Sequence, residues 1–295
     1  MASDGTPISV HSRGATLAVY RDGDPSGPTV VLVHGFPDDH SVWDRAVPLL
    51  SDLDVVRYDV RGAGASSVPG DVDGYRIERL VDDLAAVIDA VRPDGEPVHL
   101  VGHDWGSVQL WAGVFAAAED PRLTGRLASF TSISGPDLRL YGGFLRAAWR
   151  DRRLGVLCRQ LAKSWYVGAF QVPRLPEAGF DRASETIRSV LRRSQRFDRY
   201  GGDPWGPDLA RNASNGVNLY RANAFRQLGG LAPEPTDVPV TLVVPTRDDF
   251  LSPELYEDLP RRVPELDRVD VDAGHWMVWT HPERTAEVIR RRVAA

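Results

Sequence analysis

The residues with the clearest chemical meaning form the motif Gly102-x-Asp104-x-Gly106, which follows the apolar run Val98–Gly102. A glycine on each side of a central side chain is typical of the sharp strand-to-helix turn that presents a nucleophile. The central residue here is a carboxylate and not a hydroxyl. A carboxylate that attacks carbon by displacement leaves an alkyl ester on the enzyme. The alternative is that Asp104 only caps the following helix, but a simple cap does not require two flanking glycines.

Two later segments carry the partners that a carboxylate nucleophile would need. Where this turn occurs in enzymes, the chain order is nucleophile, acid and then histidine. His275 follows a late strand candidate, so its position and order predict a general base. Asp248 and Asp249 follow the apolar run Val240–Pro245, and only one of these adjacent carboxylates can face the histidine. The alternative for His275 is a surface histidine in a loop.

A motif after the first buried run would complete such a site. The segment His34-Gly35-Phe36-Pro37 begins where this run ends. We predict that the backbone N–H groups of Phe36 and Trp105 form an oxyanion hole. Such donors act only when a tetrahedral intermediate forms, and each is typically worth ~3 kcal/mol. We interpret His34 itself as a buried histidine that ties loops together.

The composition limits the class of protein. The chain has 295 residues, of which 42% are hydrophobic and 26% charged, and its formal net charge of −6 gives no support for a nucleic-acid partner. The single cysteine excludes an intrachain disulfide. There is no stretch of 18 apolar residues, and the N-terminus does not resemble a signal peptide. We therefore expect a cytoplasmic monomer or homodimer with no membrane partner. Without a cluster of ligands at metal-binding spacing, we expect no metal or cofactor.

The elements that must position these residues follow from the hydrophobic pattern. Apolar residues at helical spacing predict a helix over 75–91, and others over 105–118 and near the C-terminus. Because strands and helices alternate, we predict an α/β fold with a mostly parallel, doubly wound sheet. Buried runs predict strands at Thr29–His34, Asp54–Asp59, Val98–Gly102, Ala128–Ile133 and Val240–Pro245.

The alternation stops after Ala128–Ile133. From about residue 138 to 215 there is no good buried strand, and the segment reads as helices separated by proline and glycine. The buried strands resume after Pro235. The prediction is a core over 1–136, an inserted helical cap over 137–230 and the rest of the core over 231–295.

Taken together, these motifs resemble the epoxide hydrolase and haloalkane dehalogenase branch of the α/β-hydrolase superfamily. The matching segments are His34–Pro37, Asp59-x-Arg61-Gly62-x-Gly64-x-Ser66 and Gly102–Gly106. The chain is most similar to bacterial epoxide hydrolases whose hydrolase unit is sometimes fused to a short-chain reductase, which is absent here. The resemblance implies an α/β-hydrolase fold and favours Asp248 as the acid, with Asp137 as a minor candidate because some related enzymes take the acid from that position.

The resemblance also implies a role for two tyrosines of the cap. Epoxide hydrolases use two cap phenols to hold and protonate the epoxide oxygen. Tyr166 lies in the family's context Tyr-x-x-x-Phe-Gln-x-Pro, although Arg174 replaces the usual glycine that follows. Tyr220 lies in Asn-Leu-Tyr-Arg, where the family has tryptophan in place of Leu219. The alternative for each tyrosine is a packing role.

The implied function is the hydrolysis of an apolar epoxide to a vicinal diol through an ester of Asp104. Its partners would be that small molecule and water. The rival is a haloalkane dehalogenase with the same Asp104, Asp248 and His275, in which Trp105 and a second donor bind halide. Trp149, Trp165 and Trp205 are candidates for this donor. A non-catalytic receptor on the same fold is a more distant alternative. We expect an apolar pocket lined by Tyr141, Phe144, Trp149, Leu157, Leu161, Trp165 and Phe170.

Overall fold

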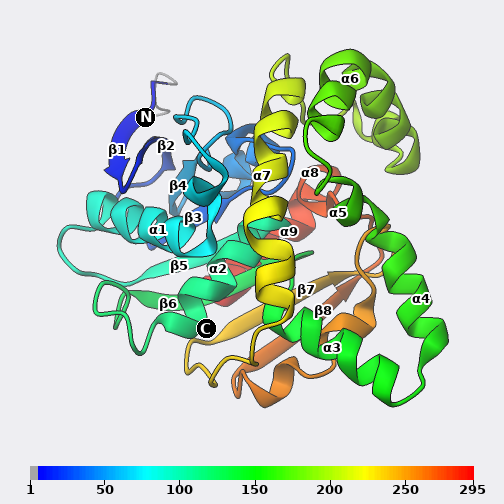
Figure 1. Cartoon of the computed structure of the whole chain (residues 1–295). Coiled ribbons are helices and arrows are strands. Elements are labelled where there is room, and N and C mark those ends of the chain that lie inside the picture. The colour runs from blue at the N-terminus through cyan, green and yellow to red at the C-terminus, as the bar shows by residue number, and fades with distance from the viewer. Residues whose placement is uncertain (1–5) are drawn as a thin grey trace.

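A single eight-stranded sheet forms the centre of the molecule in the computed structural model, which describes residues 6–295 (Figure 1). The strand order is β1-β2-β4-β3-β5-β6-β7-β8. From β4 onwards neighbouring strands are parallel, which confirms the mostly parallel α/β sheet. The strands are β1 (Ile8–Ser12), β2 (Ala15–Gly23), β3 (Thr29–Val33), β4 (Asp54–Tyr58), β5 (Val98–His103), β6 (Leu127–Ile133), β7 (Val240–Pro245) and β8 (Leu266–Val271).

The antiparallel edge of this sheet was not predicted from the sequence. Strands β1 and β2 form a hairpin, and β2 continues antiparallel onto β4. Leu17 and Val19 of β2 are fully buried and, being two residues apart, share one face of the strand. The five strands that were predicted all form, with ends that differ by one residue at most.

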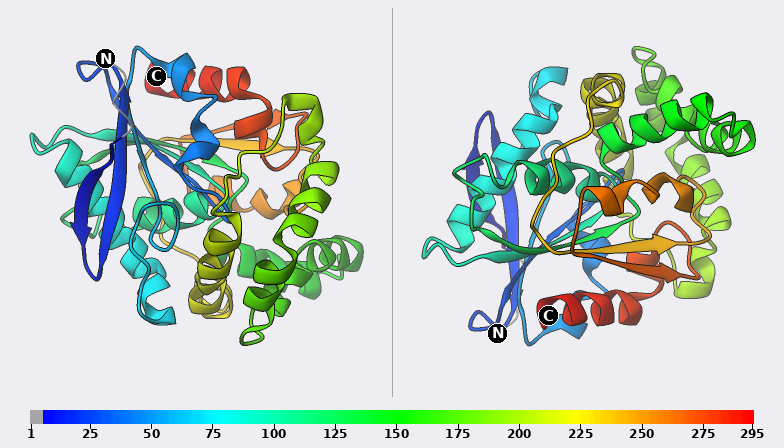
Figure 2. Two further views of the ribbon diagram at one scale, coloured as in Figure 1. Left: turned by 90° about the horizontal axis from the view of Figure 1, so that it is seen from above. Right: turned by 90° about the horizontal axis from the view of Figure 1, so that it is seen from below.

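Helices cover both faces of the sheet (Figure 2). The helices α1 (Ile77–Val91) and α2 (Trp105–Ala116) lie on one face, and α9 (Pro282–Val293) lies on the other. Each face has its own apolar core. Leu84 and Trp111 belong to the first core, and Ile289 belongs to the second. Burial on both faces explains why β3, β4 and β7 consist of entirely buried residues.

Five helices between β6 and β7 cover the end of the sheet at which the parallel strands finish (Figure 1). This matches the predicted helical segment, and the division into core and cap remains our interpretation. The helices are α3 (Leu138–Arg150), α4 (Leu154–Lys163), α5 (Trp165–Ala169), α6 (Leu175–Ser194) and α7 (Leu209–Leu228), and the short α8 (Met277–Thr280) precedes α9.

Polar side chains fasten the cap helices to the core. On α7, Asn223 donates to the backbone oxygen of Tyr75 (2.8 Å) and accepts from the N–H of Ile77 (2.8 Å). On α4, Gln160 donates to the Phe250 oxygen (3.0 Å) and accepts from the N–H of Ser252 (2.9 Å). The cap is thus held on two sides.

Candidate active site

The predicted nucleophile, Asp104, lies at the turn between β5 and α2. Its φ of 51° and ψ of −122° are unusual for a residue with a side chain. It occupies the N-cap position of α2, but its side chain makes no capping hydrogen bond. The carboxylate is therefore free to face the space beneath the cap, and the alternative of a simple helix cap does not apply.

Three glycines give this turn the space it needs. A Cβ at Gly102 would lie 2.6 Å from the backbone of Ser107, and one at Gly106 would lie 2.1 Å from the oxygen of Val33. A Cβ at Gly35 would lie 2.5 Å from the Cβ of Asp104. The two glycines of the motif are thus required by close backbone approach, and the third admits the nucleophile's own side chain.

The two backbone N–H groups predicted for an oxyanion hole lie at this turn. The N–H of Phe36 donates to Oδ2 of Asp104 at 2.8 Å. Trp105 is the first residue of α2, so its N–H has no acceptor within the helix. His34 fixes the loop that carries Phe36: its Nε2 accepts from the N–H of Val60 (2.9 Å), and its Nδ1 therefore donates to the oxygen of Gly35 (2.9 Å). This agrees with a buried structural role for His34.

The structure brings His275 between two carboxylates. Its Nε2 lies 3.5 Å from Oδ1 of Asp104, and its Nδ1 lies 2.8 Å from Oδ2 of Asp248. The adjacent Asp249 instead accepts from the amide of Gln195 (2.8 Å). Asp137 caps α3 by accepting from the N–H of Arg139 (2.8 Å). The geometry thus favours Asp248 over both alternatives.

The charges within this triad shift the pKa values of His275 and Asp248. Burial lowers the pKa of His275, but the negative charges of Asp248 and Asp104 outweigh burial and raise this pKa to about 10. Burial raises the pKa of the Asp248 carboxyl, while the charge and hydrogen bond of His275 and the N–H groups of Phe250 and Leu251 lower it to a net value below its usual range. A pKa of about 10 keeps the imidazole of His275 protonated at neutral pH.

This charge balance gives a direct prediction. In an Asp104→Asn variant, His275 loses one of its two anionic neighbours, so its pKa should fall clearly below 10. NMR titration of the imidazole Cε1–H would measure the change. Asp249→Asn is the matched control and should leave the pKa of His275 unchanged. An unchanged pKa in the Asp104 variant would show that Asp104 does not contribute to it.

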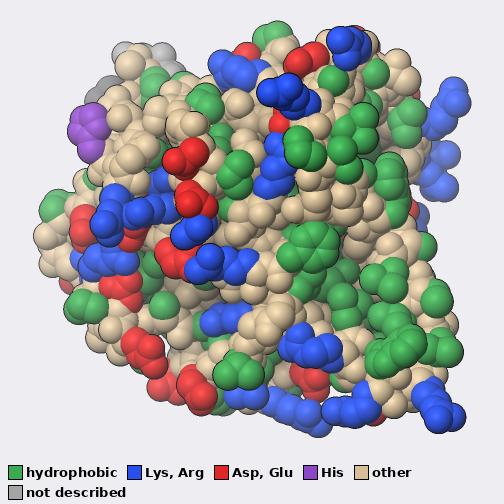
Figure 3. Space-filling model, viewed as in Figure 1, with side chains coloured by type: hydrophobic (Ala, Val, Ile, Leu, Met, Phe, Trp, Pro, Cys, Tyr) green, Lys and Arg blue, Asp and Glu red, His purple; other side chains and the backbone are tan. Residues whose placement is uncertain are grey.

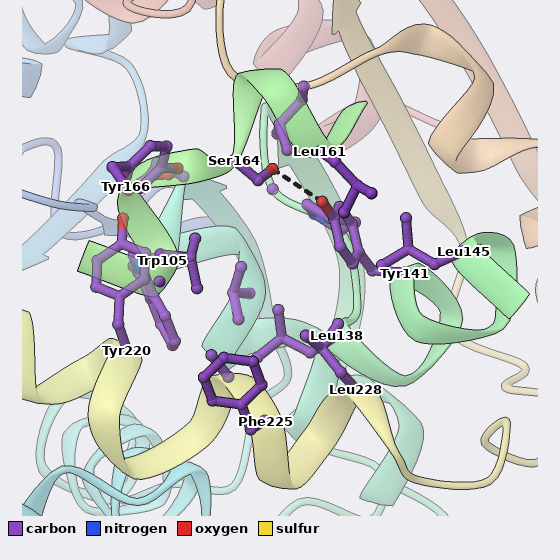
Figure 4. A pocket seen from close by; sticks show the side chains of 18 of the residues that line it. Trp105, Leu138, Tyr141, Leu145, Leu161, Ser164, Tyr166, Tyr220, Phe225 and Leu228 are labelled. Atoms are coloured by element: carbon purple, nitrogen blue, oxygen red, sulfur yellow. Dashed lines mark hydrogen bonds between the residues drawn. The ribbon is translucent and has the colours of Figure 1, made fainter. Parts of the chain in front are cut away.

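The two predicted cap tyrosines face the same cavity (Figure 4). Tyr166 is on α5 and Tyr220 is on α7, and their rings lie 5.8 Å apart at 81°. Burial, with the charge of Asp104 adding to it, raises the pKa of Tyr166 far above its usual value. Burial also raises the pKa of Tyr220, as do the neighbouring Tyr166 and Asp104. Both phenols therefore keep their protons and can donate hydrogen bonds.

Two cavities meet at these residues. One has a volume of about 340 Å³ and the other about 300 Å³, and Asp104, Trp165, Tyr166 and Tyr220 line both. The remaining walls are mostly apolar, as predicted. Tyr141, Leu161 and Trp165 line the first cavity, while Phe170 and Trp165 line the second.

For the other three residues, the prediction that they line the pocket was wrong. Phe144 and Leu157 are buried elsewhere in the cap, and Trp149 is 71% exposed at the end of α3. Helical spacing shows which residues share a face, but the neighbours of a helix decide where that face points. Residues of the core also line the cavities, such as Val108 of the first and Phe250 of the second.

A buried carboxylate behind His275 was not predicted at all. Asp38 is 2% exposed and accepts from the indole N–H of Trp205 (2.8 Å), which precedes α7, and from that of Trp276 (3.1 Å). Nδ1 of His103 lies 3.6 Å away, and its Nε2 contacts the backbone oxygen of His275 at 3.0 Å. Asp38 therefore joins the cap to the segment that carries His275. The sequence signal that could have identified Asp38 is its position directly after the segment His34–Pro37.

The sheet and the Gly-x-Asp-x-Gly turn define the class of protein as an α/β hydrolase. Residues 28–282 match the model of the alpha/beta hydrolase fold family, and the chain belongs to this family. The structure is similar to that of a Bacillus megaterium epoxide hydrolase in complex with an inhibitor, with a TM-score of 0.77 and 21% identity over 98% of this chain and all of that one.

Two curated relatives from Mycobacterium tuberculosis are similar in sequence. "Probable oxidoreductase EphD" is 40% identical over 292 residues, which cover 94% of this chain and 47% of that protein. "Epoxide hydrolase A" is 37% identical over 131 residues, which cover 44% of this chain and 38% of that protein. The match thus spans about half the length of the first of these two relatives and less of the second.

Proposed function

We propose that this α/β hydrolase converts an apolar epoxide to a vicinal diol. The observation that carries the proposal is the position of Asp104 beneath two protonated tyrosines, in walls that are otherwise mostly apolar. The relatives named epoxide hydrolase support the same reaction. An epoxide needs both a nucleophile at carbon and a proton at oxygen, and this site offers both.

In the first step, the phenols of Tyr166 and Tyr220 donate to the epoxide oxygen. The carboxylate of Asp104 attacks a ring carbon in line, and the C–O bond of the ring breaks. One phenol gives its proton to the new alkoxide, which becomes a hydroxyl group. The products of this step are an alkyl ester of Asp104 and a phenolate.

In the second step, water hydrolyses the ester. Esterification removes the charge of Asp104, so the pKa of His275 falls and the imidazolium releases its proton to solvent. The neutral imidazole then accepts a proton from the attacking water. The hydroxide attacks the carbonyl carbon of the ester, and the N–H groups of Phe36 and Trp105 stabilise the oxyanion. The diol oxygen leaves with the proton from His275, and the new carboxyl group returns a proton to the phenolate. Asp104 is then charged again, so His275 regains a proton from solvent. Asp248 keeps His275 oriented through both changes.

Dehalogenation is less well supported by the surroundings of the tryptophans. The indole N–H groups of Trp205 and Trp276 already donate to Asp38. Trp149 is exposed outside both cavities. Of the candidate second donors, only Trp165 lines the site. A departing halide also needs no proton, so the two phenols would have no chemical role.

A single turnover in ¹⁸O-water tests the ester mechanism. With enzyme in excess over styrene oxide, Asp104 should gain one ¹⁸O and the diol should carry none, because water attacks the carboxyl carbon. Mass spectrometry of the peptide that contains Asp104 reads out the label. Label in the diol and not in Asp104 would contradict the proposal. Halide release from 1-bromobutane, measured in parallel, compares the rival reaction.

A further inference from the structure

The rim of the larger cavity carries apolar side chains that are exposed at the surface. Leu161, Trp165 and Phe225 line this cavity and are 50%, 72% and 64% exposed. Figure 3 shows hydrophobic side chains gathered over α7 and α4 on this side of the molecule. Contiguous apolar surface of this kind usually marks an interaction site. Substrate access from an apolar phase would also explain why the rim itself is apolar.

The turn between α3 and α4 extends this surface. Its sequence is Trp149-Arg150-Asp151-Arg152-Arg153-Leu154, and both Trp149 and Leu154 are at least half exposed. Arg150 pairs with Asp151 and Arg153 with Glu257, whereas Arg152 has no carboxylate partner among the residues that the structure describes. An exposed tryptophan and leucine beside arginines are typical of segments that rest in the headgroup region of a bilayer.

The distribution of charge favours the same partner. Residues 137–230 contain 17 Arg and Lys and 8 Asp and Glu, so this segment has a formal charge of +9. The rest of the chain contains 18 basic and 33 acidic residues, a formal charge of −15. Near an anionic surface, this asymmetry attracts the cap and repels the core. It therefore orients the molecule with the cavity rim toward the surface.

We propose that the exposed side chains of this rim and of the α3–α4 turn dock the protein peripherally on an anionic lipid bilayer. The described residues contain no helix long and apolar enough to cross a membrane, and surface docking does not need one. The sequence-based expectation of no membrane partner considered only spanning segments and the N-terminus. The docking surface does not depend on which reaction Asp104 performs.

The test is co-sedimentation with vesicles of phosphatidylcholine containing phosphatidylglycerol, compared with phosphatidylcholine alone. We expect binding to the anionic vesicles that is at least about tenfold tighter and weakens with added salt. The double variant Arg150→Glu/Arg152→Glu should lose about tenfold or more in affinity. The control Arg13→Glu/Arg291→Glu changes two exposed arginines of the core, so it has the same net charge and should bind within about twofold of the parent protein.

A second pair separates apolar contact from charge. Trp149→Ser/Leu154→Ser should weaken binding by about tenfold, whereas Val68→Ser, an exposed apolar residue of the core, should not. Equal losses in test and control variants, or no binding at low salt, would overturn the proposal. So would self-association in light scattering that Trp149→Ser/Leu154→Ser abolishes, because a second copy would then be the partner. Styrene oxide turnover without vesicles is measured separately, so a failure of the proposed reaction is distinguishable from a failure of docking.

Discussion

A His275→Gln variant should accumulate the ester of Asp104 and release almost no diol. Asp104 can still attack the epoxide, since its approach to carbon needs no base. Hydrolysis of the ester loses the group that accepts a proton from water, and steady-state turnover should fall by about 10²–10⁴-fold. Intact-protein mass spectrometry after a brief exposure to styrene oxide should show one covalent adduct per chain. Diol formation at the parent rate would contradict the role of His275.

The adjacent aspartates offer a matched control for this experiment. Asp248→Asn removes the carboxylate that lies 2.8 Å from His275, so it should slow ester hydrolysis and leave the first step nearly intact. Asp249→Asn changes a carboxylate that binds Gln195 instead, and it should retain turnover. Equal effects of the two substitutions would indicate a loss of loop structure and not a loss of catalysis.

Removing both cap phenols should abolish ring opening. In a Tyr166→Phe/Tyr220→Phe variant, the alkoxide that forms has no proton donor, and we expect diol formation to fall by more than about 10³-fold. Each single variant keeps one phenol and should lose less. Pre-steady-state measurement of the adduct should show that the first step is the one affected, in contrast to the His275 variant.

Tyr141 provides the control for the tyrosine experiment. It lines the same cavity, but its hydroxyl bonds with Ser164 at 2.9 Å (Figure 4). Tyr141→Phe should therefore change kcat by only a few-fold. If this substitution were as damaging as the loss of Tyr166 and Tyr220, the effect would arise from cavity packing. Retained epoxide turnover in the double variant would exclude the phenols as proton donors.

The features that sequence predicted well depend on local rules. Buried β-branched runs located β3 and β7, and paired glycines located the turn at Asp104, because each pattern is set by neighbours in the chain. The choice between Asp248 and Asp249 rested on a resemblance, since both follow the same strand and only the tertiary structure decides which one meets His275. The hairpin of β1 and β2 was missed although Leu17 and Val19 share one face of β2.

The cap was harder to predict for a physical reason. Its helices have apolar residues directed toward the cavities, toward one another and toward the surface. Trp149, Phe144 and Tyr141 lie on the same helix yet end in these different environments. Contacts across the cap determine these outcomes, and no local pattern encodes them. The buried Asp38 illustrates the same point, because its two indole donors come from residues more than 160 positions away.

The carboxylate of Asp38 has a consequence for how the protein unfolds. A cap that detached from a folded core would remove the Trp205 donor from a charge that remains buried beside Trp276. Trp276 would remain as a donor, but the loss of one hydrogen bond to a buried ionised carboxylate is costly. Intermediates with a released cap are therefore disfavoured, and the inserted helices and the sheet should melt in one cooperative transition. The chain behaves as one folding unit although the cap interrupts the core in sequence.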